Sequence, residues 1–167
     1  MISRKDDLAI EQFIDLTDDL LKNELFIGMK QYNHHGKIDT HFHSVYVAYT
    51  VLNYCNRLNT EPREIVRASL LHDFYLYDWH IEKHDEMHAW YHPKAAVANI
   101  RQHIGELTPQ QENMILSHMW PLHLMPPKTL GGWLLTIADK HCSNEDYLGK
   151  SEKFREIYNE INKRTEK

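Results

Sequence analysis

Seven side chains that can bind metal ions are spread between positions 43 and 139 of the sequence. They are His43, the adjacent pair His72 and Asp73, His92, His118, His123 and Asp139. Imidazole nitrogens and carboxylate oxygens together suit divalent transition metals such as Fe, Mn, Ni, Co or Zn, whereas a calcium site uses oxygen ligands alone. If the fold brings these residues together, the sequence predicts a site for one or two such ions.

Helices must position these side chains, because apolar residues recur at helical spacing and alternating strand patterns are nearly absent. The predicted helices cover about residues 6–22, Asp39 or Thr40 to Cys55, Pro62 to His72, Pro93 to Gly105, 109–119, Trp133 to Asp139, and a last one capped by Ser151. The fold class is therefore predicted to be all-α, with residues 1–167 forming one domain.

Local signals place several helix starts relative to the chemical residues. Asp39 or Thr40 can cap a helix with His43 in its first turn. Pro93 fits a first helical position, which predicts a helix that starts just after His92. Thr108-Pro109-Gln110-Gln111 combines a capping box with a proline at the first position, which puts His118 in the last turn of that helix.

Composition limits the classes of partner. The 167 residues include 24 acidic and 19 basic ones, for a formal charge of -5, and no stripe of Lys and Arg that a DNA or RNA polymer would require. A small phosphorylated substrate stays compatible, because bound metal supplies local positive charge. Cys55 and Cys142 are too few for a disulfide framework, and no run of about 18 apolar residues predicts a membrane span. We expect a soluble cytoplasmic protein; its oligomeric state stays open.

The order of the histidines and aspartates resembles the HD superfamily of metal-dependent phosphohydrolases. That superfamily is named for an adjacent His-Asp pair, which one His precedes and a distant Asp follows. The matching segments are His43-Ser44-Val45-Tyr46-Val47-Ala48, Ala68-Ser69-Leu70-Leu71-His72-Asp73 and Ile137-Ala138-Asp139. The resemblance covers about residues 40–145. It implies an HD-type helical bundle that cleaves phosphoester or phosphoanhydride bonds with a metal-activated water.

His92 and His118 resemble the extra ligands of the two-metal branch, which includes diadenosine tetraphosphate hydrolases and HD-GYP cyclic dinucleotide phosphodiesterases. The resemblance implies one ion held by His43, His72, Asp73 and Asp139, and a second held by Asp73, His92 and His118. Asp73 would then be the shared catalytic carboxylate. The implied substrate is small and nucleotide-like.

The sequence departs from that branch in two places. Phe74 and Tyr75 follow the His-Asp pair where a Lys often stands, and no Gly-Tyr-Pro follows His118. Cleavage of cyclic dinucleotides is therefore not expected. The cation that would bind phosphate is open among Lys94, Lys128 and Lys140, and we predict substrate contacts from Lys94 and His123.

A rival metal site is a row of imidazoles four residues apart, at His80, His84, His88 and His92. On one continuous helix these side chains would share a face. Asp85 and Glu86 indicate solvent instead, so we favour an exposed polar segment or a lid for the first three. Two rival functions also stay open: a di-iron oxygenase of HD type, and a regulatory domain that keeps a metal only for stability.

Overall fold

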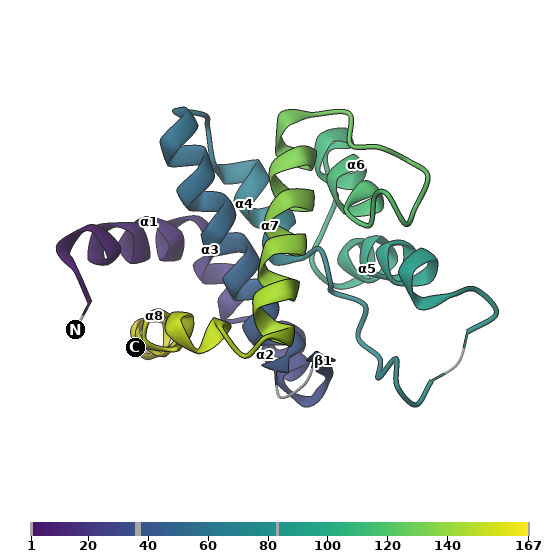
Figure 1. The fold of residues 1–167 in the computed structure, drawn as a ribbon, viewed down its shortest axis with the longest axis horizontal. Coiled ribbons are helices and arrows are strands. Elements are labelled where there is room, and N and C mark those ends of the chain that lie inside the picture. Colours follow the sequence, from purple (N-terminus) through teal and green to yellow (C-terminus); the bar gives the residue numbers. More distant parts are fainter. Residues whose placement is uncertain (1, 36–37, 83, 167) are drawn as a thin grey trace.

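The computed structural model describes residues 2–35, 38–82 and 84–166 (Figure 1). Helix accounts for 69% of the structure and strand for two short segments, so the predicted all-α class is confirmed. Among the described helices, none is long and apolar enough to cross a membrane. The helices are α1 (Arg4–Leu21), α2 (Glu24–Gly28), α3 (Thr40–Leu58), α4 (Arg63–Leu70), α5 (His88–His103), α6 (Pro109–Ser117), α7 (Leu130–Tyr147) and α8 (Arg155–Thr165).

Helix α3 lies at the centre of the bundle. It packs against α7 and α4, with α1 and α8 toward one side of the molecule and α5 and α6 toward the other (Figure 1). Every residue from Thr40 to Tyr49 is buried. A helix that is covered on all sides must bury its polar side chains along with its apolar ones. The histidines in the first turns of α3 are therefore held in the protein interior.

Capping side chains set the helix ends near the site. Asp39 accepts a hydrogen bond from the Phe42 nitrogen at 2.8 Å, so Asp39 rather than Thr40 caps α3. The predicted capping box of α6 is confirmed, since Thr108 and Gln111 each bond the other's backbone nitrogen. These contacts fix where α3 and α6 begin, and hence where His43 and His118 lie along them.

Glycine lets α7 approach its neighbours closely. A Cβ atom at Gly131 would lie 2.9 Å from Met114 Sδ and 3.0 Å from Ile65 Cγ1. Any larger residue at this position would push the first turn of α7 away from α6 and α4. This close contact helps to set the position of α7 and of Asp139, two turns further along it.

Helix α5 starts earlier than the sequence predicted. It begins at His88, so the expected start after His92 is wrong, and Pro93 lies inside the helix. Pro93 removes only the hydrogen bond that its nitrogen would donate to the Ala89 carbonyl. The preceding turn keeps backbone hydrogen bonds from Trp90 and Tyr91 to the Met87 carbonyl, and the His88 and His92 rings stack beside it with centroids 4.6 Å apart.

Short elements between α1 and α3 were not predicted. They are α2, the 3-10 turn Met29–Gln31, and a hairpin of strands β1 (Asn33–His35) and β2 (Ile38–Asp39). Before the last helix, the predicted cap at Ser151 is wrong: Ser151–Phe154 forms a second 3-10 turn, and α8 follows it without a side-chain cap. Strands of three and two residues are too short for an alternating pattern to be recognised. The hairpin runs directly into α3, which places it beside the site.

Candidate metal centre

All six residues predicted as metal ligands are brought together in one buried cluster. His43 lies in the first turn of α3, His92 lies in α5 and Asp139 lies in α7. His72 and Asp73 follow the end of α4, and His118 follows the end of α6. Each of the six is at most 5% exposed. Five separate segments of the chain therefore deliver imidazoles and carboxylates to one place.

His43, His72 and Asp139 form the first half of the cluster, and His92 and His118 form the second half. Asp139 is the carboxylate of the first half. Its Oδ1 lies 3.2 Å from His43 Nε2 and 3.7 Å from His72 Nε2. These three residues offer ligand atoms that all lie within 4.8 Å of one another. One cation can therefore contact all three.

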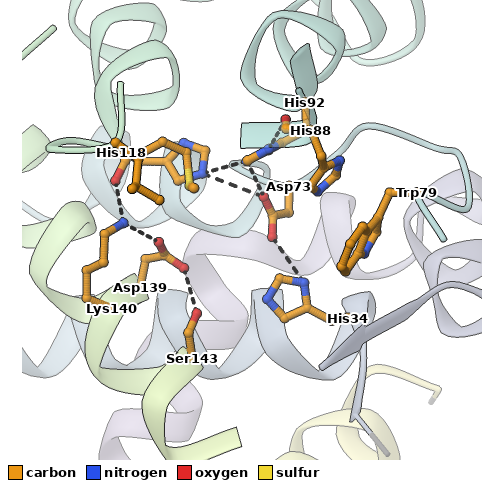
Figure 2. A pocket seen from close by; sticks show the side chains of 11 residues that line it. His34, Asp73, Trp79, His88, His92, His118, Asp139, Lys140 and Ser143 are labelled. Atoms are coloured by element: carbon orange, nitrogen blue, oxygen red, sulfur yellow. Dashed lines mark hydrogen bonds and ion pairs between the residues drawn. The ribbon is translucent and has the colours of Figure 1, made fainter. Parts of the chain in front are cut away.

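Asp73 lies between the two halves of the cluster, and Figure 2 shows it beside His92 and His118. Its Oδ1 is 3.3 Å from His92 Nε2 and 3.7 Å from His118 Nε2, whereas its Oδ2 is 3.5 Å from His72 Nε2. The two oxygens of one carboxylate thus face different sets of imidazoles. This arrangement suits a carboxylate that is shared by two ions.

Backbone carbonyls orient three of the imidazoles. Each of these rings donates a hydrogen bond from Nδ1 to a backbone carbonyl three or four residues earlier in the chain. The pairs are His72 with Ser69 at 2.8 Å, His92 with His88 at 2.9 Å, and His118 with Ile115 at 2.6 Å. With the proton held on Nδ1, the neutral ring presents its lone pair at Nε2. All three lone pairs therefore point toward the carboxylates of the cluster.

Two of these lone pairs face each other. His92 Nε2 lies 2.9 Å from His118 Nε2, although both rings already donate from Nδ1. Two acceptor nitrogens at this distance repel each other unless a proton or a metal ion lies at them. His72 Nε2 and Asp73 Oδ1 are also buried without a hydrogen-bond partner. Buried polar atoms without partners are costly, so this donor set fits bound cations.

The ionised carboxylates of Asp73 and Asp139 make the cluster favourable for positive charge. Burial alone would raise the pKa of Asp73, but the neighbouring His72 and His92 imidazoles hold it well below its usual value. The pKa of Asp139 is likewise held low against burial, by the neighbouring His43 and His72 imidazoles. Both carboxylates are therefore negative at neutral pH, and they attract either protons on the imidazoles or metal ions.

The two halves differ in how strongly they hold a proton. Burial lowers the pKa of His118 to about 3, so this imidazole is neutral and available as a ligand. Burial also opposes a charge on His43, but hydrogen bonds with Asp139 and Asp146 outweigh it and raise its pKa to about 10. The first half of the cluster therefore favours a positive charge next to His43 and Asp139.

A pocket of about 280 Å³ opens onto the cluster. Its walls include the apolar side chains of Trp79, Met119 and Leu122. Lys140 also lines it and donates hydrogen bonds to Asp139 Oδ2 at 3.2 Å and to the His118 carbonyl at 3.0 Å (Figure 2). A small molecule in this pocket would meet the candidate metal ligands, one ammonium group and an apolar wall.

The structure separates the candidate substrate residues. Of the three lysines considered from the sequence, Lys140 lines the pocket and neither Lys94 nor Lys128 does. Lys94 forms an ion pair with Glu86 at 2.7 Å, because its side chain leaves α5 about 200° away from that of His92. The His123 ring packs on Trp90 with centroids 4.6 Å apart, also outside the lining residues.

Four residues near the cluster were missed in the sequence. Ser143 and Asp146 follow Asp139 by four and seven positions, a spacing that puts all three on one face of α7 and could have revealed them. His88 lies one turn before His92, and was assigned to an exposed segment although it lines the pocket. His34 has no local signal, because only the hairpin brings it to the site.

The rival row of imidazoles is not continuous. Because α5 begins at His88, His80 and His84 lie before it in irregular structure and do not share its face. The His80 side chain is 46% exposed, as the solvated interpretation predicted, whereas His84 is half-buried and its ring packs against Tyr77 and Tyr91. The metal-binding geometry therefore belongs to the cluster around Asp73 and Asp139.

Comparison with known proteins adds no assignment, since no family model, no curated protein and no solved structure matches this chain. Any functional conclusion therefore depends on the geometry and chemistry of the cluster itself.

Proposed function

We propose that this protein is a metal-dependent phosphohydrolase that cleaves a phosphoester or phosphoanhydride bond in a small substrate. The observation that carries this proposal is the orientation of four imidazoles, whose Nδ1 atoms are held from outside while their Nε2 atoms converge on two ionised carboxylates. Such anchoring is typical of histidines that bind metals. The ordered motif that resembles the HD superfamily supports the same reading.

The residues divide into two proposed ion positions. His43, His72 and Asp139 would hold one ion, His92 and His118 the other, and Asp73 would contribute one oxygen to each. When bound, divalent transition-metal ions supply a water of lowered pKa and neutralise charge on phosphoryl oxygens. Among the described residues that line the pocket, Ser143 is the one with a hydroxyl or thiol group, and it donates its hydroxyl proton to Asp139.

Side chains at the pocket suit a phosphorylated molecule with an organic part. Lys140 presents its ammonium group at the pocket wall, where it can pair with a phosphoryl oxygen as well as with Asp139. Trp79, Met119 and Leu122 offer an apolar surface for the rest of the substrate and limit the water around it. A nucleotide-like substrate would place its base on the Trp79 side.

The test combines metal analysis with phosphate release. Purified protein should contain transition metal and release phosphate from one or more of a panel of nucleoside mono-, di- and dinucleoside polyphosphates and simple phosphomonoesters. Asp73→Ala should lose nearly all metal and turnover, because Asp73 contacts both halves of the cluster. Asp85→Ala, at an exposed position outside the cluster, is the matched control and should change neither.

Two outcomes would overturn the proposal. A fully metal-loaded protein that consumes oxygen while oxidising a substrate, without phosphate release, would assign it to the oxygenase class. A fully loaded protein that turns over none of the panel and none of the oxidisable substrates would indicate a metal-stabilised regulatory domain.

A further inference from the structure

His34 lies against the first half of the cluster. It belongs to β1, is 8% exposed and lines the pocket. Its ring stacks on the His43 ring, with centroids 3.8 Å apart and planes 26° apart. Its Nδ1 is 3.7 Å from Asp73 Oδ2, the oxygen that also faces His72. Figure 2 shows this imidazole directed at Asp73 from the side opposite His92.

The hairpin holds His34 in this place through the start of α3. The Tyr32 carbonyl accepts hydrogen bonds from both the Thr40 nitrogen, at 2.9 Å, and the Thr40 hydroxyl, at 3.1 Å. Asp39, the last residue of β2, pairs with Asn33 and also caps α3. The strand that carries His34 and the helical turn that carries His43 are therefore one connected unit.

We propose that His34 is an additional metal ligand at the first ion position, an inference that rests on the metal binding of the proposed function. His34, His43 and Asp73 offer ligand atoms that all lie within 4.8 Å of one another, as His43, His72 and Asp139 do. The two groups share His43. The candidate ligands of an ion bound beside His43 are therefore the members of these two groups: His34, His43, His72, Asp73 and Asp139.

This ligand makes the two ion positions unequal. With His34 added, the first position has more candidate protein donors than the second, whose candidates are Asp73, His92 and His118. An ion held by many protein ligands binds tightly and has few positions left for water, while an ion with three protein ligands keeps positions open for water and substrate. The ion at the first position is thus the more tightly bound one. The ion at the second position exchanges more readily and contacts the substrate.

The inference is tested by titrating the metal-free protein with Co²⁺ and following the visible absorption of the bound ion. Wild type should bind two ions with clearly different affinities. His34→Ala and His34→Gln should lower the Co²⁺ affinity of the tighter site by at least roughly 10- to 100-fold, because the loss of a residue that only supports a ligand already has an effect of that size. Both variants should also change the absorption spectrum of this site. The weaker site should keep its affinity. His103→Ala, which removes an exposed imidazole from α5, is the matched control.

The result is independent of turnover. Wild-type affinities and spectrum in both His34 variants would overturn the role of His34, whatever the activity. Loss of the weaker site instead of the tighter one would overturn the assignment to the first position. Phosphate release failing in a protein that carries two Co²⁺ ions would overturn the proposed function and leave His34 as a ligand. Thermal unfolding in a chelator checks that each variant folds, and if His34→Ala does not, His34→Gln decides the question.

Discussion

His43 Nδ1 lies 2.6 Å from Asp146 Oδ2, and both side chains are fully buried. The other anchored imidazoles donate to backbone carbonyls, so His43 is the member of the cluster whose outer nitrogen bonds a carboxylate. A carboxylate in this position fixes the ring and makes its Nε2 a better ligand. Asp146 is thus tied to the proposed first ion without contacting it.

Replacing Asp146 with Asn tests that relation. The amide oxygen can still accept the Nδ1 proton of His43, but the negative charge is lost. We expect the affinity of the tighter Co²⁺ site to fall roughly 10- to 100-fold, with the weaker site unchanged. Asp85→Asn, at an exposed position, serves as the control. Equal affinities in the wild type and Asp146→Asn would mean that this hydrogen bond serves packing alone.

His92→Ala should separate the two ion positions. His92 Nε2 faces Asp73 Oδ1 and His118, but no atom of Asp139. We therefore expect elemental analysis of the variant to find one ion where wild type holds two, with phosphate release strongly reduced. Two ions retained in the variant would contradict the placement of His92.

Lys140 should matter for substrate and not for metal. Lys140→Met keeps most of the side-chain length and removes the charge. Loss of a charged hydrogen bond to the substrate weakens the interaction by about 1.5–3 kcal/mol. We expect kcat/KM for the phosphorylated substrate to fall about 10- to 100-fold with metal content unchanged. Lys94→Met is the control, because Lys94 pairs with Glu86 outside the pocket. Equal losses in both variants would point to a general effect of surface charge.

His41 should make stability depend on pH. Burial lowers the pKa of His41 to about 3, and its Nδ1 bonds the Tyr158 hydroxyl at 2.9 Å. The unfolded chain takes up this proton near pH 6.5 and the folded one does not, so stability is full above that pH and falls below it. Between pH 7.5 and 5.0 this residue should remove about 2 kcal/mol from the free energy of unfolding.

Urea unfolding in the presence of a chelator measures this effect. His41→Phe should be less stable than the wild type at pH 7.5, because Tyr158 loses its partner, but its stability should fall by about 2 kcal/mol less on acidification. Other buried imidazoles contribute equally to both proteins. Parallel pH profiles for the two would show that His41 is already neutral in the unfolded chain or charged in the folded one.

Residue types and local spacing were enough to predict most of the long helices and to select the six clustered residues as candidates. Asp39 and the Thr108–Gln111 pair cap helices through contacts within four residues, which any reading of the sequence can recognise. Transition-metal ligands are likewise recognised by type, since few side chains can serve. The all-α class and the choice of candidate ligands followed from these local properties.

Tertiary structure decided the contacts that join distant segments. His34 reaches the cluster through a hairpin too short to leave a pattern, and Asp146 meets His43 across 103 positions of sequence. Helix α5 starts at His88 although Pro93 favours a first-turn position. Lys140 faces the pocket and Lys94 does not because the rotation of each helix is set by the surface it buries. The packing energies that decide these contacts arise between distant segments, so they cannot be recognised from a local sequence pattern.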